Sequence, residues 1–161
     1  KYPKNYIDFL QNTYLLFQVY KYDVSLKKQK KKKKKTYFID NGLVKKLGFM
    51  FSDNLGRLLE NLVFIELMRR RKQVYYHKQK YECDFVIKDG NRITEAFQVC
   101  YALENEETRT REIKGLTEAL SAYDLNEGII LTNSVEEDLH VAGKSIRFLP
   151  AWKWLLSNDK K

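Results

Sequence analysis

The chain has 161 residues, of which 43% are hydrophobic and 14% aromatic, so it can bury one core and carry a small appendage. No segment approaches the roughly 20 apolar residues of a membrane span, and the N-terminal residues lack the apolar region of a signal peptide. We therefore expect a cytoplasmic protein with no membrane partner. The net charge is +9, but eight of the nine residues 27–35 are lysine, and without them the charge falls to +1.

The first elements predict the end of a winged-helix segment. A helix is expected from Pro3 to about Asn12, followed by an alternating strand around residues 15–19 and a lysine-rich loop. We assign residues 1–26 to the winged-helix remnant and 27–35 to the loop, and we expect the chain to be a piece of a longer protein. A short strand at Thr36–Asp40 opens the third unit, which spans 36–161.

The lysine-rich segment has two interpretations. Eight like charges repel one another and resist burial, which is typical of a solvated, mobile loop. Contacts with the phosphates of DNA need only positive charge and no fixed geometry. The candidate nucleic-acid-binding residues are Lys30, Lys31, Lys32, Lys33, Lys34 and Lys35.

The rest of the chain predicts an α/β domain with a mixed sheet. The order is helix, three strands, helix and strand, in which an Asp-Gly turn joins the second and third strands as an antiparallel hairpin. Ser52-Asp53-Asn54 supplies caps for the first helix. The six elements are expected at about Asn54–Arg71, Gln73–Lys78, Glu82–Lys88, Arg92–Ala102, Thr108–Tyr123 and Gly128–Thr132.

Three further elements follow this core. Ser134–Glu137 matches a capping box and predicts a small helix. A strand is expected at Ser145–Leu149, and a helix that carries Trp152 and Trp154 begins at Pro150. We expect both tryptophans to pack against the core.

Polar residues on neighbouring strands predict a shared site. Side chains in a strand alternate, so Glu82 and Asp84 share one face of their strand, as do Gln98 and Cys100 in the next. If Asp84 and Gln98 lie on the same side, Glu60 on the preceding helix completes a group of oxygen ligands. Such oxygens bind Mg²⁺ or Mn²⁺, which can activate water against a phosphodiester.

The same alternation predicts where the cysteines lie. Cys100 is expected to face the polar group and Cys83 the opposite side of the sheet, so no disulfide joins them. With two histidines, His77 and His140, the cysteines also form no zinc pattern. No glycine-rich nucleotide-binding loop occurs in the chain.

Several segments occur in a fixed order along the chain: Tyr37–Leu43, Gly56–Asn61, Glu82–Val86, Gln98–Tyr101, Arg111–Ile113 and Pro150–Leu156. Together they resemble the C-terminal domain of prokaryotic AAA+ ATPases, a domain-of-unknown-function family with a restriction-endonuclease-like fold. The resemblance covers nearly the whole chain. It implies that the ATPase, its ATP and most of the winged helix lie upstream. It also implies the PD-(D/E)XK nuclease superfamily, whose core order is α-β-β-β-α-β.

The resemblance gives each site residue a role. Glu60 is the helix carboxylate, Asp84 is the metal-binding aspartate, and Gln98 falls at the second carboxylate. Cys100 stands where the pattern has a lysine, and Lys78 is one candidate to replace it. The site is therefore degenerate, and any Mg²⁺ is expected to bind weakly, through Glu60, Glu82 and Asp84.

Each site residue also has an ordinary structural interpretation. Glu60 can be an exposed helix carboxylate. A buried Asp84 needs a partner, which can be Arg111 in place of a metal. Arg111 and Glu112 can equally form a structural ion pair that supports the site.

Glu66 lies almost along the apolar stripe of its helix. It is expected to pair with Arg69 or Arg70, at i+3 and i+4, since residues at those spacings are neighbours on a helix.

Three functions remain open from the sequence. The first is a DNA-interacting, nuclease-like module of an AAA+ ATPase with little or no cleavage activity. The second is a structural or oligomerisation domain of the ATPase that touches no nucleic acid. The third is an active Mg²⁺-dependent nuclease with a rearranged site. The expected partners are DNA, the upstream ATPase domain and further copies of the chain.

Overall fold

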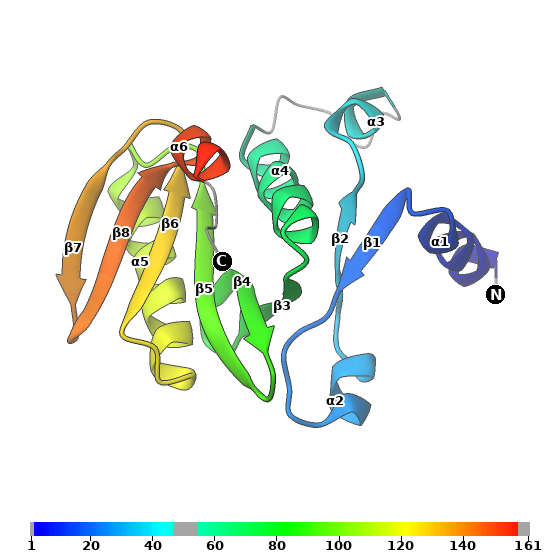
Figure 1. The fold of residues 1–161 in the computed structure, drawn as a ribbon, viewed down its shortest axis with the longest axis horizontal. Coiled ribbons are helices and arrows are strands. Elements are labelled where there is room, and N and C mark those ends of the chain that lie inside the picture. Colours follow the sequence, from blue (N-terminus) through cyan, green and yellow to red (C-terminus); the bar gives the residue numbers. More distant parts are fainter. Residues whose placement is uncertain (1, 47–54, 158–161) are drawn as a thin grey trace.

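The computed structural model describes residues 2–46 and 55–157. Its N-terminal part is a helix, a two-stranded antiparallel ribbon and two short helices (Figure 1). These elements are α1 (Tyr2–Asn12), β1 (Leu16–Val19), α2 (Leu26–Lys31), β2 (Lys35–Phe38) and α3 (Asn41–Lys46).

The second part contains a six-stranded mixed sheet and three helices. Its elements are α4 (Leu55–Arg69), β3 (Gln73–Lys78), β4 (Glu82–Asp89), β5 (Arg92–Cys100), α5 (Glu106–Ala122), β6 (Glu127–Thr132), β7 (Glu137–Val141), β8 (Lys144–Pro150) and α6 (Ala151–Leu156). The observed order from α4 to β6 is the helix, three strands, helix and strand expected from the sequence. The caps predicted at residues 52–54 lie outside the described residues.

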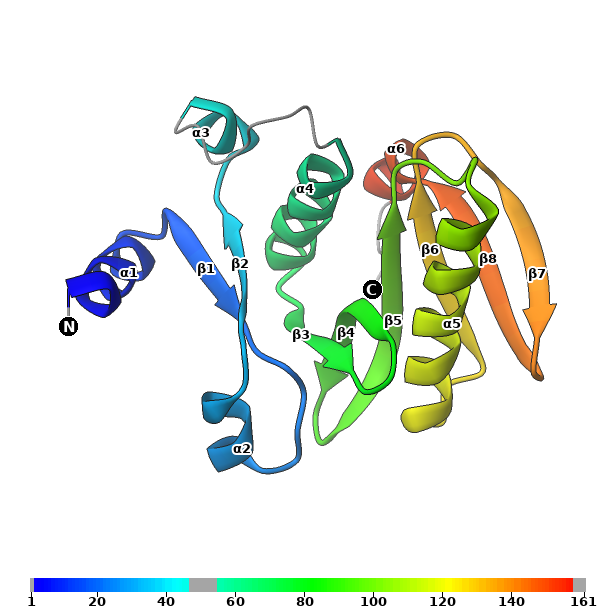
Figure 2. The same ribbon diagram turned by 180° about the vertical axis from the view of Figure 1, so that it is seen from behind.

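The sheet has the strand order β3-β4-β5-β6-β8-β7. Its β3-β4-β5 half is antiparallel, β5-β6 and β6-β8 are parallel, and β7 is antiparallel to β8. Helix α5 covers one face, as Figure 2 shows, and α4 and α6 lie against the other. The protein is therefore a mixed α/β structure with helices on both faces of the sheet, as the sequence predicts.

Two apolar cores lie on opposite faces of the sheet. The core under α4 contains Phe64, Phe85 and Trp154 and extends to Val19 and Tyr37 of the ribbon. The core under α5 gathers the inward side chains of that helix and of the central strands. It includes Cys83, Val86, Ala96, Cys100, Leu116, Leu120, Ile130 and Phe148. The ribbon thus belongs to the same folded body as the sheet.

The ribbon also covers one edge of the sheet. After β1 the chain runs beside β3, where Tyr22 N donates to Tyr76 O at 2.9 Å and Tyr76 N donates to Tyr20 O at 3.1 Å. This pairing satisfies backbone groups of β3 that an open edge would leave exposed.

Residues 27–35 do not form the single loop that we expected. Leu26–Lys31 is helical, because Gln29 is buried and its side-chain amide donates to Asp23 O. The one residue that interrupts the lysine run is therefore buried and bonded to the loop that precedes α2. Lys35 begins strand β2, and residues 32–34 connect the two elements.

The helix predicted at Ser134–Glu137 is wrong. Glu137–Val141 instead forms β7, which pairs with β8 through a tight turn at Ala142 and Gly143, both with positive φ. A complete strand pairing satisfies more backbone groups than one capped helical turn.

No helix among the described residues is long and apolar enough to cross a membrane.

Candidate functional site

A cleft of about 840 Å³ opens between the N-terminal ends of α4 and α5. Its other walls are the β3–β4 turn and the C-terminal end of β5. Glu60, Glu82, Asp84, Gln98 and Glu112 all line it. The structure therefore brings the acidic and amide residues chosen from the sequence to one cleft.

A bulge in β4 decides which way Asp84 points. Cys83 pairs with His77 and Val86 pairs with Tyr75, so three residue steps on β4 oppose two on β3. One extra residue on a strand reverses the alternation of side chains beyond it. The Asp84 side chain is thereby directed to the α4 side of the sheet, where its carboxylate meets groups from α4 and β2.

Lys35 is the centre of the acidic group. Its Nζ atom lies 2.6 Å from an Asp84 oxygen, 2.9 Å from a Glu82 oxygen and 3.1 Å from a Glu60 oxygen. The Lys35 side chain is only 19% exposed, and that of Asp84 is 10% exposed. The sequence placed Lys35 among DNA-contacting lysines, but in the structure its ammonium group is directed inward to the carboxylates.

Hydrogen bonds from the surrounding protein hold the carboxylates in place. The Tyr37 hydroxyl donates to Glu60 at 2.6 Å, and Val99 N donates to the second oxygen of Asp84 at 3.0 Å. Lys78 contacts the second oxygen of Glu82 at 3.2 Å. Charge-assisted bonds of this kind are roughly twice as strong as neutral ones.

The pKa values follow from the three carboxylates sharing one buried ammonium group. Burial opposes the charge on Lys35, but Asp84, Glu60 and Glu82 outweigh it and raise the pKa of Lys35 above its ordinary value. Burial, together with the neighbouring charge of Glu60, raises the pKa of Asp84 above the ordinary 3.8, against the pull of Lys35. Lys35 therefore stays charged and is shared by the three carboxylates.

Gln98 points to the other face of the sheet, toward α5. Its side-chain oxygen accepts from Asp84 N at 3.0 Å, and its amide nitrogen donates to Glu112. Glu112 also pairs with Arg111 at 2.7 Å. Arg111 and Glu112 therefore form the structural ion pair that the sequence allowed, and the partner of Asp84 is Lys35 instead of Arg111.

The prediction for the cysteines is wrong on one point. Cys83 and Cys100 both belong to the core under α5, so the two sulfurs lie on the same face of the sheet. The bulge explains this, since it moves Cys83 to the α5 side and Asp84 to the α4 side. Asp84 and Gln98 consequently touch through a backbone amide, and their side chains do not meet on a common face.

The other lysines of the run behave differently from Lys35. Lys34 donates to Gln18 at 2.7 Å and lies over the Tyr20 ring. Of the six candidates for phosphate contacts, those with exposed side chains are Lys30, Lys31, Lys32 and Lys33, and Lys27 and Lys28 of the same run are exposed as well.

Two residues at the acidic group, Lys35 and Tyr37, were not recognised from the sequence as its members. They alternate on β2 and therefore share a face, and Tyr37 is buried. The sequence Lys35-Thr36-Tyr37-Phe38 contains this alternation. Lys35 was nevertheless assigned to the preceding run of lysines, because a run of like charges suggests a solvated segment.

The side chains of this site do not fit a divalent metal as they stand. One oxygen of each of the three carboxylates, Glu60, Glu82 and Asp84, already lies within 3.1 Å of the Lys35 ammonium group. Gln98, to which the resemblance assigns the position of a second carboxylate, contacts Asp84 N and Glu112. Within residues 2–46 and 55–157, no group of three or more His, Cys, Asp and Glu side chains is arranged to hold a metal ion.

Two curated relatives match most of the chain. An uncharacterized protein of Methanocaldococcus jannaschii is 36% identical over 168 residues, which cover 95% of this chain and 36% of the relative. An uncharacterized protein of Haemophilus influenzae is 30% identical over 148 residues, which cover 91% of this chain and 35% of the relative. The chain thus spans about a third of the length of these relatives. No solved structure matches it significantly.

Two family models match the chain side by side. Residues 2–54 match a domain of unknown function, DUF8612, which contains α1, the ribbon and the lysine-rich segment. Residues 55–154 match a second, DUF4143, which contains the sheet and most of the cleft. This second match covers more than half of the chain, which therefore belongs to the family defined by the domain of unknown function DUF4143.

Proposed function

We propose that the chain is a DNA-interacting, nuclease-like module of a longer prokaryotic AAA+ ATPase, and that its site has lost most or all cleavage activity. Domains of the DUF4143 family commonly follow AAA ATPase domains. The observed order α4-β3-β4-β5-α5-β6 is also the core order of restriction-endonuclease-like proteins, and it supports that fold.

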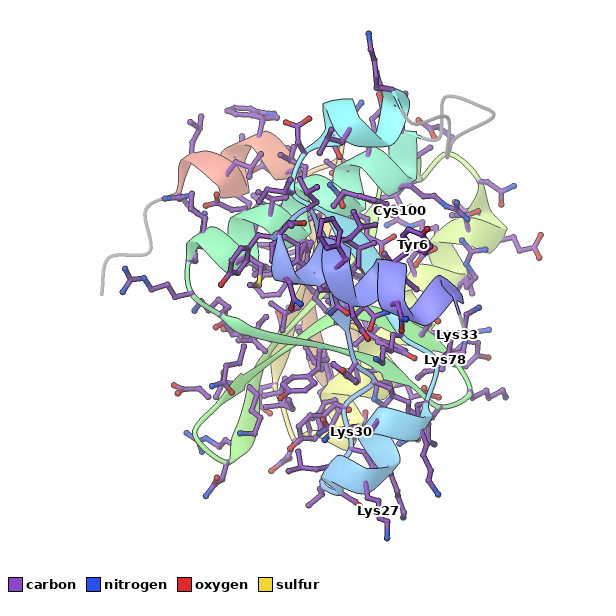
Figure 3. All side chains as sticks on the ribbon, turned by 90° about the vertical axis from the view of Figure 1, so that its right-hand side faces the viewer. Tyr6, Lys27, Lys30, Lys33, Lys78 and Cys100 are labelled. Carbon is purple, nitrogen blue, oxygen red and sulfur yellow. The ribbon has the colours of Figure 1, made fainter. Side chains whose placement is uncertain are left out.

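The observation that carries the proposal is the position of exposed lysines beside an acidic cleft. In the view of Figure 3, Lys33 and Lys78 project near each other at one edge, with Lys30 and Lys27 below them, and Lys78 lines the cleft. Tyr76 of β3 connects these parts, since its hydroxyl donates to Lys33 O. A row of ammonium groups that leads to a cleft suits a polymer with regularly spaced phosphates.

The N-terminal elements support the same partner. Helix α1, followed by a two-stranded ribbon whose connection carries the lysines, is the arrangement found at the end of a winged helix. In that arrangement the connection between the strands extends toward nucleic acid. Gln29 fixes α2 to the protein, so the lysines of α2 are presented from a defined element.

The loss of cleavage follows from the contacts of the site residues. Gln98 is neutral, and its side chain is hydrogen-bonded to Asp84 N and to Glu112. The Cys100 sulfur is directed to Ala102 O at 3.1 Å. Neither residue supplies a charge to a phosphate. Removing one preorganised group that stabilises developing charge typically lowers a rate by about 10²–10³, so two departures leave little activity.

The test is binding and cleavage of DNA by three forms of the chain: unaltered, Asp84→Ala, and Gln98→Glu/Cys100→Lys. We expect the unaltered chain to bind DNA without cutting plasmid or single-stranded DNA in the presence of Mg²⁺ or Mn²⁺. Cleavage that appears only in the double variant supports a degenerate nuclease site. Robust cleavage by the unaltered chain that Asp84→Ala abolishes would show an active enzyme instead.

A second candidate function is a structural domain that binds other parts of the ATPase. The observation that favours it is the exposure of Tyr6, Phe9 and Tyr14, which are each more than 60% accessible on and after α1. Clustered exposed aromatic residues often mark protein contacts. Absence of any salt-sensitive DNA binding would favour this function over the first.

A further inference from the structure

The acidic group at the cleft disagrees with the metal site that a nuclease-like fold implies. We infer that Lys35 takes the place of the metal, as the resident cation of Glu60, Glu82 and Asp84, and that it locks the N-terminal ribbon onto the sheet. The lock is a structural device of this chain and does not depend on nucleic-acid binding.

The distances make the ammonium group and a metal ion mutually exclusive. Lys35 Nζ lies within 3.1 Å of all three carboxylates, which is direct contact with each. A magnesium ion held by the same three carboxylates would have to approach one oxygen of each to about 2.0–2.1 Å. The second oxygens of Asp84 and Glu82 are already bonded to Val99 N and to Lys78. The ion would then lie against the ammonium group, and two like charges so close in a partly buried site repel strongly.

The Lys35 backbone is held on both sides. Upstream, Lys33 O accepts from the Tyr76 hydroxyl. Downstream, the Asn61 side chain accepts from Phe38 N at 2.8 Å and donates to Phe38 O at 3.0 Å. These bonds fix the backbone of β2 to β3 and α4. Lys35 can therefore leave the carboxylates only by a movement of its side chain, which would break its ion pairs with all three.

The lock joins the two family segments. Lys35 comes from the segment 2–54, whereas the three carboxylates come from the segment 55–154. Tyr37 adds a second bond of the same kind, since its hydroxyl donates to Glu60 at 2.6 Å. Three carboxylates this close repel one another unless cations neutralise them. Lys78 of the sheet domain contacts Glu82 at 3.2 Å, whereas Lys35 contacts all three.

The test compares thermal unfolding of the full chain with those of Lys35→Met and Lys33→Met. Lys33 is exposed, so Lys33→Met removes the same charge without touching the carboxylates. We expect Lys35→Met to lower the unfolding midpoint by about 10 °C and Lys33→Met to leave it nearly unchanged. If Lys35→Met does not fold, Lys35→Met/Asp84→Asn, which also removes one carboxylate charge, is measured instead.

Each protein is also heated with Mn²⁺ and with EDTA, without DNA. The unaltered chain is expected to respond to neither, whereas Mn²⁺ is expected to raise the midpoint of the Lys35 variant. Three results would each contradict the lock. The first is that Mn²⁺ raises the unfolding midpoint of the unaltered chain and Asp84→Asn removes this effect. The second is a Lys35 variant with the same midpoint as Lys33→Met, and the third is a Lys35 variant whose midpoint Mn²⁺ does not change. Since no nucleic acid is present, these outcomes are separate from failure of the DNA proposal.

Discussion

Glu66 gathers two arginines at the C-terminal end of α4. Arg69 approaches it to 2.6 Å and Arg70 to 2.7 Å. Arg70 then continues to α6, where it donates to the backbone oxygens of Trp154 and Ser157 and lies over the Trp154 ring. The hydrogen bond from Arg69, helped by Arg70 and opposed by burial, lowers the pKa of Glu66 below the ordinary 4.5. Glu66 thus ties α4 to α6.

Replacing Glu66 by Gln should make the protein less stable in a pH-dependent way. A carboxylate with a lowered folded pKa contributes stability above its unfolded pKa and loses it as the pH falls through the folded value. We expect Glu66→Gln to cost about 2 kcal/mol near neutral pH, from lost charge-assisted hydrogen bonds. The difference in the free energy of unfolding between this variant and the unaltered chain should become smaller as the pH falls below 4.5, the ordinary pKa of a glutamate. Denaturant unfolding at a series of pH values measures it, and a pH-independent difference would contradict the ion-pair explanation.

Predictions from the sequence at this scale succeeded where the geometry was regular. Helical spacing predicted the pairing of Glu66 with Arg69 and Arg70, and the structure confirms it. The prediction from strand alternation failed at Asp84. It assumes regular pairing along the whole strand, and the residues Glu82-Cys83-Asp84-Phe85 contain no signal of the β-bulge. The same limit applies to the tryptophans: Trp154 is buried as expected, but Trp152 is 55% exposed.

At the scale of elements, Gly115 allows α5 to approach β4 closely. A Cβ atom at this position would lie 2.2 Å from Glu82 O, which is a backbone atom and cannot rotate away. Gly115 therefore sets the distance between α5 and the strand that carries Glu82 and Asp84, and it brings Glu112, one turn earlier on α5, to the cleft.

Gly115→Ala should destabilise the protein although alanine is the better helix former. The intrinsic gain is about 1 kcal/mol, whereas forcing a methyl group into a packed contact costs about 1–3 kcal/mol, and here the obstacle is backbone. Ser121→Ala, at an exposed position of the same helix, is the control and should be neutral or slightly stabilising. Both are measured by chemical unfolding. A Gly115 variant as stable as the control would mean that α5 can move away from β4 at no cost.

The sequence predicted most elements because their patterns were long and consistent. The Val and Tyr content of residues 73–78, the Asp-Gly turn after residues 82–88 and the apolar stripe of α4 predicted these elements, and the observed bounds agree within a few residues. The elements that the sequence did not predict, β7, α2 and α3, are short. Strand β7 forms by pairing with the next strand, β8, and in α2 the Gln29 side chain donates to the backbone oxygen of Asp23, six residues earlier. The capping-box pattern and the charge run, on which the two predictions rested, report neither strand pairing nor a side-chain bond to the backbone.

At the scale of the molecule, the lysine run serves two purposes at its two ends. Its last member, Lys35, is directed inward and neutralises the acidic group. The members before Lys34, which are Lys27, Lys28 and Lys30 to Lys33, are exposed. The lysines of this run therefore do not all have the same role. The fold around Gln29 and Tyr37 distinguishes the exposed lysines from the inward-directed Lys35. The sequence predicted a positively charged surface but not that Lys35 is directed inward while other lysines of the run are exposed.

The salt dependence of DNA affinity tests the exposed part of the run. Each phosphate contact that is lost reduces the slope of log affinity against log salt by about 0.9 on duplex DNA. We expect Lys30→Gln/Lys31→Gln to reduce the slope by up to about 2 and to weaken binding to all sequences similarly. Lys45→Gln/Lys46→Gln is a matched control, because these lysines also end a short helix, α3, which lies at the other end of the ribbon in Figure 1.

Fluorescence anisotropy with a labelled duplex at several salt concentrations measures both variants against the unaltered chain. If the control reduces the slope as much as Lys30→Gln/Lys31→Gln does, net charge and not the position of α2 determines binding. An unchanged slope in both variants would place the phosphate contacts elsewhere and leave the α2 lysines as a solvated surface. Only a reduction confined to Lys30→Gln/Lys31→Gln agrees with DNA lying along α2 toward the cleft.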